Sequence, residues 1–262
     1  MSRNFELLQQ ACVDLSGTLA GGVEVPFGFK PSGARGAKAK DRVHVASLKP
    51  ADLSKAAREE TLRLVQSVFL LRETGEAGRV VVFASVNPDG GCSRVCVQAA
   101  QVLAESVPSS VCIVDANFRE PSLPGAFGIA NHHGLADALR THEPLRSYAR
   151  ALRSNLWLIS CGSGTDMAVG LLHSDCAKQR IDELRKEFSY VLIDAPPLNM
   201  YSEGVALGQF SDGLVLILEA NSTRRDASSR IAERLRAMQV NILGAVLNKR
   251  TFPIPDTLYR CL

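Results

Sequence analysis

The sequence predicts an α/β fold in which helices cover both faces of a doubly wound, mainly parallel β-sheet. Two observations support this class. Short apolar runs rich in Val, Ile and Leu alternate with longer segments of helical periodicity, and the runs are unbroken, as in strands buried on both faces. The stretch 79–104 also joins such a run to a helix through a glycine-rich turn, which is how α/β sheets commonly hold a phosphate group.

The composition is that of a chain with one full hydrophobic core. Hydrophobic residues make up 46% of the 262 residues, which is enough to bury one domain. The net charge of +3 is too small to indicate nucleic-acid binding. The seven cysteines are odd in number and form no C-x-x-C pair, which predicts reduced thiols and no metal cluster. No apolar run approaches the ~18 residues that a membrane helix needs, so we expect a cytoplasmic protein.

Three segments are expected along the chain. Residues 1–45 form a mobile N-terminal arm, because 21–41 is rich in Gly, Ala, Lys and Pro and has little to pack. Residues 46–250 form the folded domain. Residues 251–262 form a tail whose apolar residues and two prolines suit a docking segment. The basic charge of the arm fits either a solubilising linker or a contact with an anionic membrane surface.

The sequence of the first part of the domain predicts a helix, a strand and a second helix. The first helix begins at Asp52 or Ser54 as N-cap and runs to Arg72. A buried strand follows at 80–84. The Asn-Pro-Asp-Gly-Gly turn after it cannot continue a strand, and helical spacing begins at Cys92.

The later elements continue the alternation of strands and helices. Strands are expected at 111–115, 155–160, 190–194, 213–219 and 242–247. Helices are expected at 134–140, 144–152, about 167–188, 202–210 and 225–239. This order predicts parallel pairing with crossover helices.

The polar residues that follow the strands form the candidate site, because ligands bind beyond the carboxyl ends of parallel strands. They are Asp89–Ser93, Asp115–Arg119, Asp194–Pro197, Asn221–Arg225 and Asn248. Asp115 and Asp194 each end an apolar run, where a carboxylate is costly to bury unless it is paired or bound to a metal. Two such aspartates near a phosphate-binding turn indicate a nucleotide site with Mg²⁺, which prefers oxygen ligands.

Three motifs, in this order, resemble those of one family. Residues 85–93 are similar to a phosphate loop of the pattern S-x-x-P-G-E-G-K-S, 113–119 to apolar residues followed by D-x-D-x-R, and 192–197 to apolar residues followed by D-x-P-P. The family is the bacterial tyrosine kinases of capsule and exopolysaccharide assembly, relatives of the MinD- and ParA-like P-loop ATPases. The resemblance covers 59–248 and implies a P-loop NTPase fold.

The resemblance implies a role for each matching residue. The residues that bind ATP would be Asp89, Gly90, Gly91, Cys92, Ser93, Arg94 and Asn248, the last at the adenine base. The ligands of Mg²⁺, directly or through water, would be Ser93, Asp115 and Asp194. Asp115 and Arg119 would be catalytic, Asp115 by accepting the proton of an incoming tyrosine hydroxyl. Tyr259, the one tyrosine of the tail, is the candidate phosphoacceptor.

The sequence also departs from the family pattern. Cys92 stands where the loop lysine is expected, so the charge that would neutralise the β- and γ-phosphates is missing. Arg94 could replace that charge only in part and only if the loop is rearranged. Asn117 replaces the second acid of its motif, and Asp89 adds a negative charge where a phosphate should approach.

Two functions stay open on these motifs. One is an ATP-dependent protein-tyrosine kinase that regulates exopolysaccharide or capsule synthesis or export. The other is a catalytically impaired pseudokinase that binds nucleotide or a partner as a scaffold in the same pathway. The retained Ser93, Asp115 and Asp194 favour the first, whereas Cys92 and Asn117 favour the second. A ParA- or MinD-like positioning ATPase fits less well, because the loop lacks the early lysine of that group.

The resemblance also implies partners. A membrane-spanning polysaccharide co-polymerase or activator would recruit the chain to the inner face of the cell membrane. A homo-oligomer is also implied, although the oligomerisation motif E-x-x-R-x-x-R has Gln66 in place of its last arginine. At a helix N-terminus, the Cys92 thiol invites a redox or nucleophilic interpretation, and a small filler residue is the simpler one.

Overall fold

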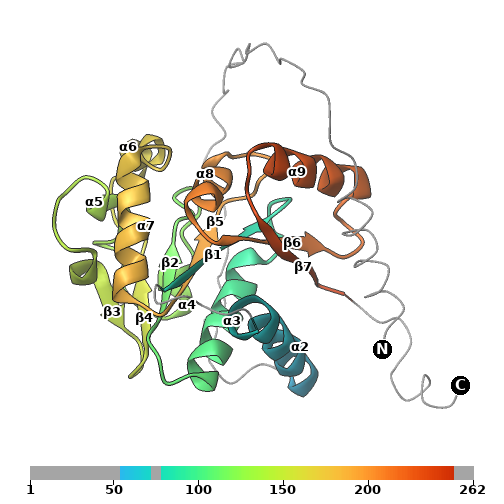
Figure 1. The fold of residues 1–262 in the computed structure, drawn as a ribbon, viewed down its shortest axis with the longest axis horizontal. Helices are drawn as coiled ribbons and strands as arrows, with labels where there is room; N and C mark the ends of the chain where they lie inside the picture. The colour runs from blue at the N-terminus through green and yellow to red at the C-terminus, as the bar shows by residue number, and fades with distance from the viewer. Residues whose placement is uncertain (1–53, 72–77, 251–262) are drawn as a thin grey trace, which may run out of the picture. The chain divides into compact units, whose positions relative to one another are not determined.

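The structure, a computed structural model, describes residues 54–71 and 78–250. The predicted arm, the tail with Tyr259, and the N-cap candidate Asp52 lie outside these residues. The domain boundaries at 45 and 250 therefore stay predictions. Within the described residues the predicted fold class is confirmed: a mainly parallel sheet carries helices on both faces (Figure 1).

The sheet has the strand order β3-β4-β2-β5-β1-β6-β7. The strands are β1 (Arg79–Ser85), β2 (Val111–Asp115), β3 (Ala149–Ala151), β4 (Leu156–Ile159), β5 (Tyr190–Ala195), β6 (Gly213–Glu219) and β7 (Ile242–Asn248). All neighbours pair in parallel except β3, which is antiparallel to β4. The carboxyl ends of β1, β2, β5, β6 and β7 consequently meet at one edge, where a ligand site is expected.

The helices form two layers, one on each face of the sheet. The helices are α2 (Lys55–Val65), α3 (Cys92–Ser106), α4 (Leu123–Ala126), α5 (Leu135–Ala138), α6 (Thr165–Leu171), α7 (Asp175–Glu187), α8 (Glu203–Phe210) and α9 (Arg225–Ala237). Helices α2, α3 and α4 share one apolar core with the sheet, and α5 to α9 share the other. Strand β1 serves both cores, with Val80 and Val82 in one and Val81 and Phe83 in the other. This explains its unbroken apolar run.

The predicted start of the first helix at Ser54 is confirmed. The Ser54 Oγ accepts a hydrogen bond from the Ala57 N–H at 3.2 Å, which satisfies one of the free donors of the first turn. After α2 the chain continues as a π-helical turn over Gln66–Leu70. Val68 and Phe69 of this turn are buried in the same core as α3.

The helix predicted at 144–152 is wrong. The chain there forms a 3₁₀ turn over Leu145–Tyr148 and then enters β3, the short edge strand. The main-chain N–H of Leu152 donates to the Leu156 carbonyl at 2.8 Å and closes a hairpin between β3 and β4. Pairing with β4 supplies hydrogen bonds that an isolated short helix would leave unmade.

The long helix predicted at about 167–188 is also wrong in one respect, because it is two helices, α6 and α7. The break follows Leu171, whose carbonyl accepts a hydrogen bond from the Ser174 Oγ at 2.7 Å. Ser174 is extended and precedes α7, which begins with Asp175 in its first turn, as a helix start favours. None of the helices in the described ranges is long and apolar enough to cross a membrane.

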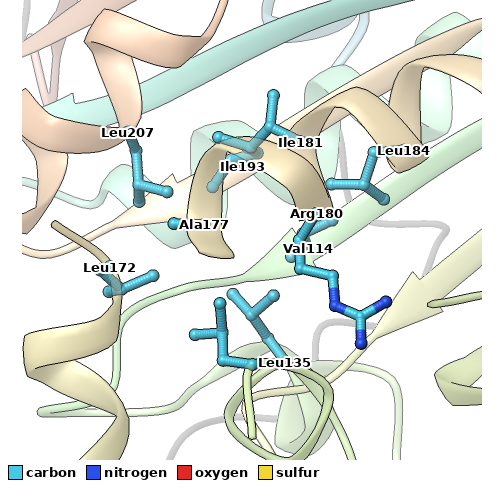
Figure 2. Close-up of a pocket in the computed structure, with 10 residues that line it drawn as sticks. Val114, Leu135, Leu172, Ala177, Arg180, Ile181, Leu184, Ile193 and Leu207 are labelled. Carbon is cyan, nitrogen blue, oxygen red and sulfur yellow. The ribbon is translucent and has the colours of Figure 1, made fainter. Parts of the chain in front are cut away.

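A small cavity lies between α7 and the sheet (Figure 2). Its lining is apolar apart from Arg180, and Figure 2 shows the guanidinium directed away from the other side chains. That guanidinium donates to the main-chain carbonyls of Ala138, at 3.0 and 2.8 Å, and Thr141, at 2.6 Å. Its donors thus hold the end of α5 in place, and the cavity is a gap in packing rather than a ligand site.

Candidate nucleotide-binding site

The predicted phosphate loop connects β1 to α3. Gly91 is the N-cap of α3 with φ +77°, and Asp89 also has a positive φ of 59°. Within the described part of the chain, the N–H groups of 89–94 donate to no main-chain oxygen outside the helix. Free N–H groups at the start of a 15-residue helix, together with its dipole, favour an anion at this point.

Two neighbouring loops hold this loop in place. The Asn248 Nδ2, at the end of β7, donates to the Gly90 carbonyl at 2.9 Å, and a Cβ on Gly91 would collide with the same amide. After β5, the Asn199 N–H donates to the Val86 carbonyl at 3.1 Å and its Nδ2 to the Asn87 Oδ1 at 2.9 Å. The Asn248 amide is thus engaged with the loop, and its contact with an adenine base stays a prediction.

Asp115 and Asp194 come together as the sequence predicted. They are direct partners in the register of β2 and β5, and both are fully buried. Neither carboxylate oxygen of Asp194 has a partner of good hydrogen-bond geometry among the described residues, although the Ser93 hydroxyl and the Cys92 thiol lie near it. A buried carboxylate without a partner is costly, so the environment of Asp194 favours binding of a cation or a proton.

Asp115 differs from Asp194 in its environment, because its oxygens already accept hydrogen bonds. The Oδ2 accepts from the N–H groups of Ser122 and Leu123, both at 3.1 Å, and the Oδ1 accepts from that of Asn117 at 3.2 Å. The Cys161 thiol lies 3.7 Å from the Oδ1. Asp115 therefore organises the chain segment that follows β2.

Burial shifts the pKa of the acids and thiols at this site. It raises the pKa of Asp115 to about 8, with a contribution from the charge of Asp194, and it raises the pKa of Asp194 to about 6. The Ser93 hydroxyl and the Cys92 thiol lie close enough to offset part of the shift at Asp194. Burial and Asp194 also raise the pKa of the Cys92 thiol well above its usual range. A neutral, buried thiol supports the filler interpretation of Cys92 over a nucleophilic one.

The shift at Asp194 predicts a pH-dependent gain in stability for Asp194→Asn without nucleotide and Mg²⁺. A raised pKa means that the stability contribution is present below about pH 4 and is lost as the pH rises through about 6. The variant has no such loss, so it should exceed the wild type by roughly 1–3 kcal/mol at pH 8 and by much less at pH 4. Urea unfolding at both pH values measures this, and a difference that does not change with pH would contradict it.

Among the described residues, neither of the two predicted arginines forms an ion pair with Asp115 or Asp194. Arg94 is exposed on α3. Arg119 pairs with the buried Glu203 at 3.3 Å, and its guanidinium carbon lies 5.0 Å from the centre of the Tyr201 ring. Arg119 is thus held against α8 and the segment before it, and its predicted catalytic role stays a prediction.

Sequence reasoning missed two residues that lie beside the loop. The Lys249 Cε is 3.9 Å from where a Cβ of Gly91 would lie, and the Lys249 Nζ pairs with the Glu219 Oε1 at 3.0 Å. Glu219 ends β6 and Lys249 follows β7, so the rule of strand ends could have included both.

The residues present fit a nucleotide with Mg²⁺. The free N–H groups suit phosphate oxygens, and the Ser93 hydroxyl lies near the unpartnered Asp194 carboxylate. In the described ranges no group of three or more His, Cys, Asp or Glu could hold a metal ion. Mg²⁺ needs no such group, because it usually keeps several waters and takes one or two protein ligands.

Comparison with known proteins agrees with the motifs. No protein-family model matches the chain. The tyrosine-protein kinase YwqD of Bacillus subtilis is 24% identical over 195 residues, which are 74% of this chain and 82% of YwqD. CpsD of Streptococcus pneumoniae serotype 4 is 25% identical, over 67% of this chain and 78% of CpsD. The tyrosine-protein kinase etk of Escherichia coli K12 is 25% identical over 69% of this chain, which spans only 24% of etk.

Solved structures resemble the fold. The kinase domain of Escherichia coli etk has a TM-score of 0.69 and 25% identity, covering 84% of this chain and 86% of that domain. The BceF tyrosine kinase domain has a TM-score of 0.64 and 26% identity, covering 78% of this chain and 80% of that domain. A ParA family ATPase from Chlorobium tepidum, at 17% identity and a TM-score of 0.55 over 66% of this chain and 75% of that one, shares the fold alone.

The sheet order and the strand–loop–helix unit of β1 and α3 match the P-loop NTPase fold of the tyrosine kinase domains and the ParA family ATPase. Within this fold class, the homologues of the chain are bacterial tyrosine kinases.

Proposed function

We propose that the chain binds ATP with Mg²⁺ at the loop between β1 and α3, and acts as a tyrosine-kinase-like regulator of exopolysaccharide or capsule synthesis or export. The observation that carries the proposal is the buried, unpartnered Asp194 carboxylate beside Ser93 at the start of α3. The bacterial tyrosine kinases among the homologues support the kinase class. A related fold, that of a Cyanothece McdA variant, was solved as a complex with ATP and has a TM-score of 0.54.

Each group of the site has one task in this proposal. The N–H groups of the loop and of the first turn of α3 hold phosphate oxygens. The Ser93 hydroxyl and the Asp194 carboxylate would hold Mg²⁺, directly or through water, which would supply positive charge to offset that of the phosphates. Asp115 keeps the segment after β2 in place beside them.

Calorimetric titration with ADP and ATP, with and without Mg²⁺, tests the binding. We expect micromolar binding that depends on Mg²⁺ in the wild type and is lost in Asp194→Asn. The same variant should be more stable than the wild type at pH 8, so its loss of binding could not be attributed to unfolding. No binding by the wild type up to millimolar nucleotide would contradict the proposal.

A catalytically impaired scaffold is the second candidate. Two observations favour it: the Asp115 oxygens accept three main-chain hydrogen bonds, and the Cys92 side chain carries no charge near the loop. Phosphotyrosine detection after incubation with Mg²⁺ and ATP separates the candidates. A signal that disappears in Tyr259→Phe supports the kinase, and nucleotide binding without any signal supports the scaffold.

The partner proposal rests on the family resemblance. A membrane-spanning co-polymerase or activator would bring the chain to the inner face of the cell membrane from the cytoplasm. A homo-oligomer would use α2, where Glu60 and Arg63 form an exposed ion pair at 2.8 Å. Co-fractionation with the cytosolic segment of a candidate partner tests the first, and sedimentation of the purified chain tests the second.

A further inference from the structure

The predicted phosphate loop carries acidic residues but no positive charge from its own motif. Asp89, Asp115 and Asp194 lie in or beside the loop, and the loop position where the resemblance expects lysine holds the uncharged Cys92. Of the two arginines in the motifs, Arg94 is exposed on α3, and Arg119 pairs with Glu203. A polyphosphate that entered this loop would therefore meet acids without a cation from the motifs.

Lys249 lies beside the phosphate loop. It follows β7 directly after Asn248, whose amide donates to the Gly90 carbonyl and thereby fixes the end of β7 against the loop. Lys249 has a positive φ of 55°, which turns the chain at that point. Its side chain passes over the loop glycine, with the Cε 3.9 Å from the position of a Cβ on Gly91.

The ammonium of Lys249 is available to a new partner. Its Nζ pairs with the Glu219 Oε1 at 3.0 Å, and the Lys249 side chain is 45% exposed. A partly exposed ion pair of this kind contributes little stability, so it can be exchanged for a stronger one. A phosphate group carries more charge than one carboxylate and accepts several charge-assisted hydrogen bonds.

We propose that Lys249, from the end of β7, supplies the phosphate-binding cation that the loop itself lacks, and that Glu219 holds its ammonium when no nucleotide is bound. The proposal rests on the proposed nucleotide binding and names a residue that serves it. It also implies selectivity: Lys249 favours ligands with a β- or γ-phosphate, and Glu219 opposes them by competing for the same ammonium.

Substitutions of Lys249 and Glu219 should change the affinity for ATP in opposite directions. In calorimetric titration with Mg²⁺ and ATP, Lys249→Met should weaken binding by about 10-fold or more, because one charge-assisted contact is lost. Glu219→Gln should strengthen binding several-fold, because the ammonium is released and a negative charge is removed. Lys178→Met, which removes an exposed lysine on α7, is the matched control and should bind as the wild type does.

A purely structural pair would behave differently. Either substitution would then break the same contact and change binding in the same direction. The ratio of ATP to AMP affinity adds a second readout, which Lys249→Met should lower and a general loosening of the loop should not. Thermal unfolding of each variant without nucleotide checks that it is folded.

The outcomes are distinguishable. Wild-type binding with Lys249→Met indistinguishable from the Lys178→Met control would overturn this inference and leave the proposed function standing. Glu219→Gln weakening ATP binding as much as Lys249→Met would also overturn it. No nucleotide binding by the wild type would overturn both.

Discussion

Asp115→Ala is expected to lower the free energy of unfolding by about 1–3 kcal/mol, because it leaves buried main-chain donors without their acceptor. The Asp115 carboxylate is fully buried and accepts hydrogen bonds from the N–H groups of Asn117, Ser122 and Leu123. Alanine would leave these donors without their acceptor and would open a gap at the end of β2. Urea unfolding at pH 7, monitored by circular dichroism, measures the change.

Asp115→Asn is the matched control for this prediction. It keeps the size of the side chain and one oxygen, which can accept from Ser122 and Leu123, and it removes the repulsion from Asp194. We therefore expect a cost well below that of alanine. An alanine variant within about 1 kcal/mol of the wild type would show that the segment after β2 does not depend on this carboxylate.

The strands could be predicted because each is a short apolar run whose length and composition suit burial on both faces. The run at 80–84 lies inside the sheet, between β5 and β6, with Val80 and Phe83 in opposite cores. Strand β3 could not be predicted in this way. Ala149–Ala151 is largely exposed and has no apolar run, and only its hairpin contact with β4 makes it a strand.

The meeting of Asp115 and Asp194 could be predicted because parallel strands end at one edge, whatever their separation in the sequence. The difference between them could not. Whether a buried carboxylate has donors depends on the path of the chain beyond the strand, and the segment after Asp115 returns its N–H groups to it. The segment after Asp194 returns none to that side chain.

The rule of strand ends could place Lys249 near the loop, because it follows β7 directly after Asn248, but it could not predict the contact with Gly91. An exposed lysine is usually solvated. The contact of Lys249 with the loop follows from a positive φ at one residue and from the amide of Asn248, both of which are properties of the folded chain.

Cys92→Lys is expected to raise the affinity for ATP by about 10- to 100-fold, the value of one or more charge-assisted contacts. Cys92 begins α3, and its thiol lies beside the unpartnered Asp194 carboxylate. An ammonium introduced there would meet a buried negative charge and stand next to the free N–H groups of the loop. Titration with ATP, ADP and AMP measures the gain, which should be largest for ATP.

Cys92→Met separates charge from size, because its side chain is long and apolar and should bring no gain. Equal affinities for the Lys and Met variants would contradict the prediction. The double variant with Lys249→Met gives the sharper result. If Lys249 supplies the cation in the wild type, its removal should matter less once a lysine stands at position 92, since both ammonium groups serve the same phosphates. If Lys249→Met lowers ATP affinity by the same factor with Cys92 and with lysine at position 92, the two residues act independently.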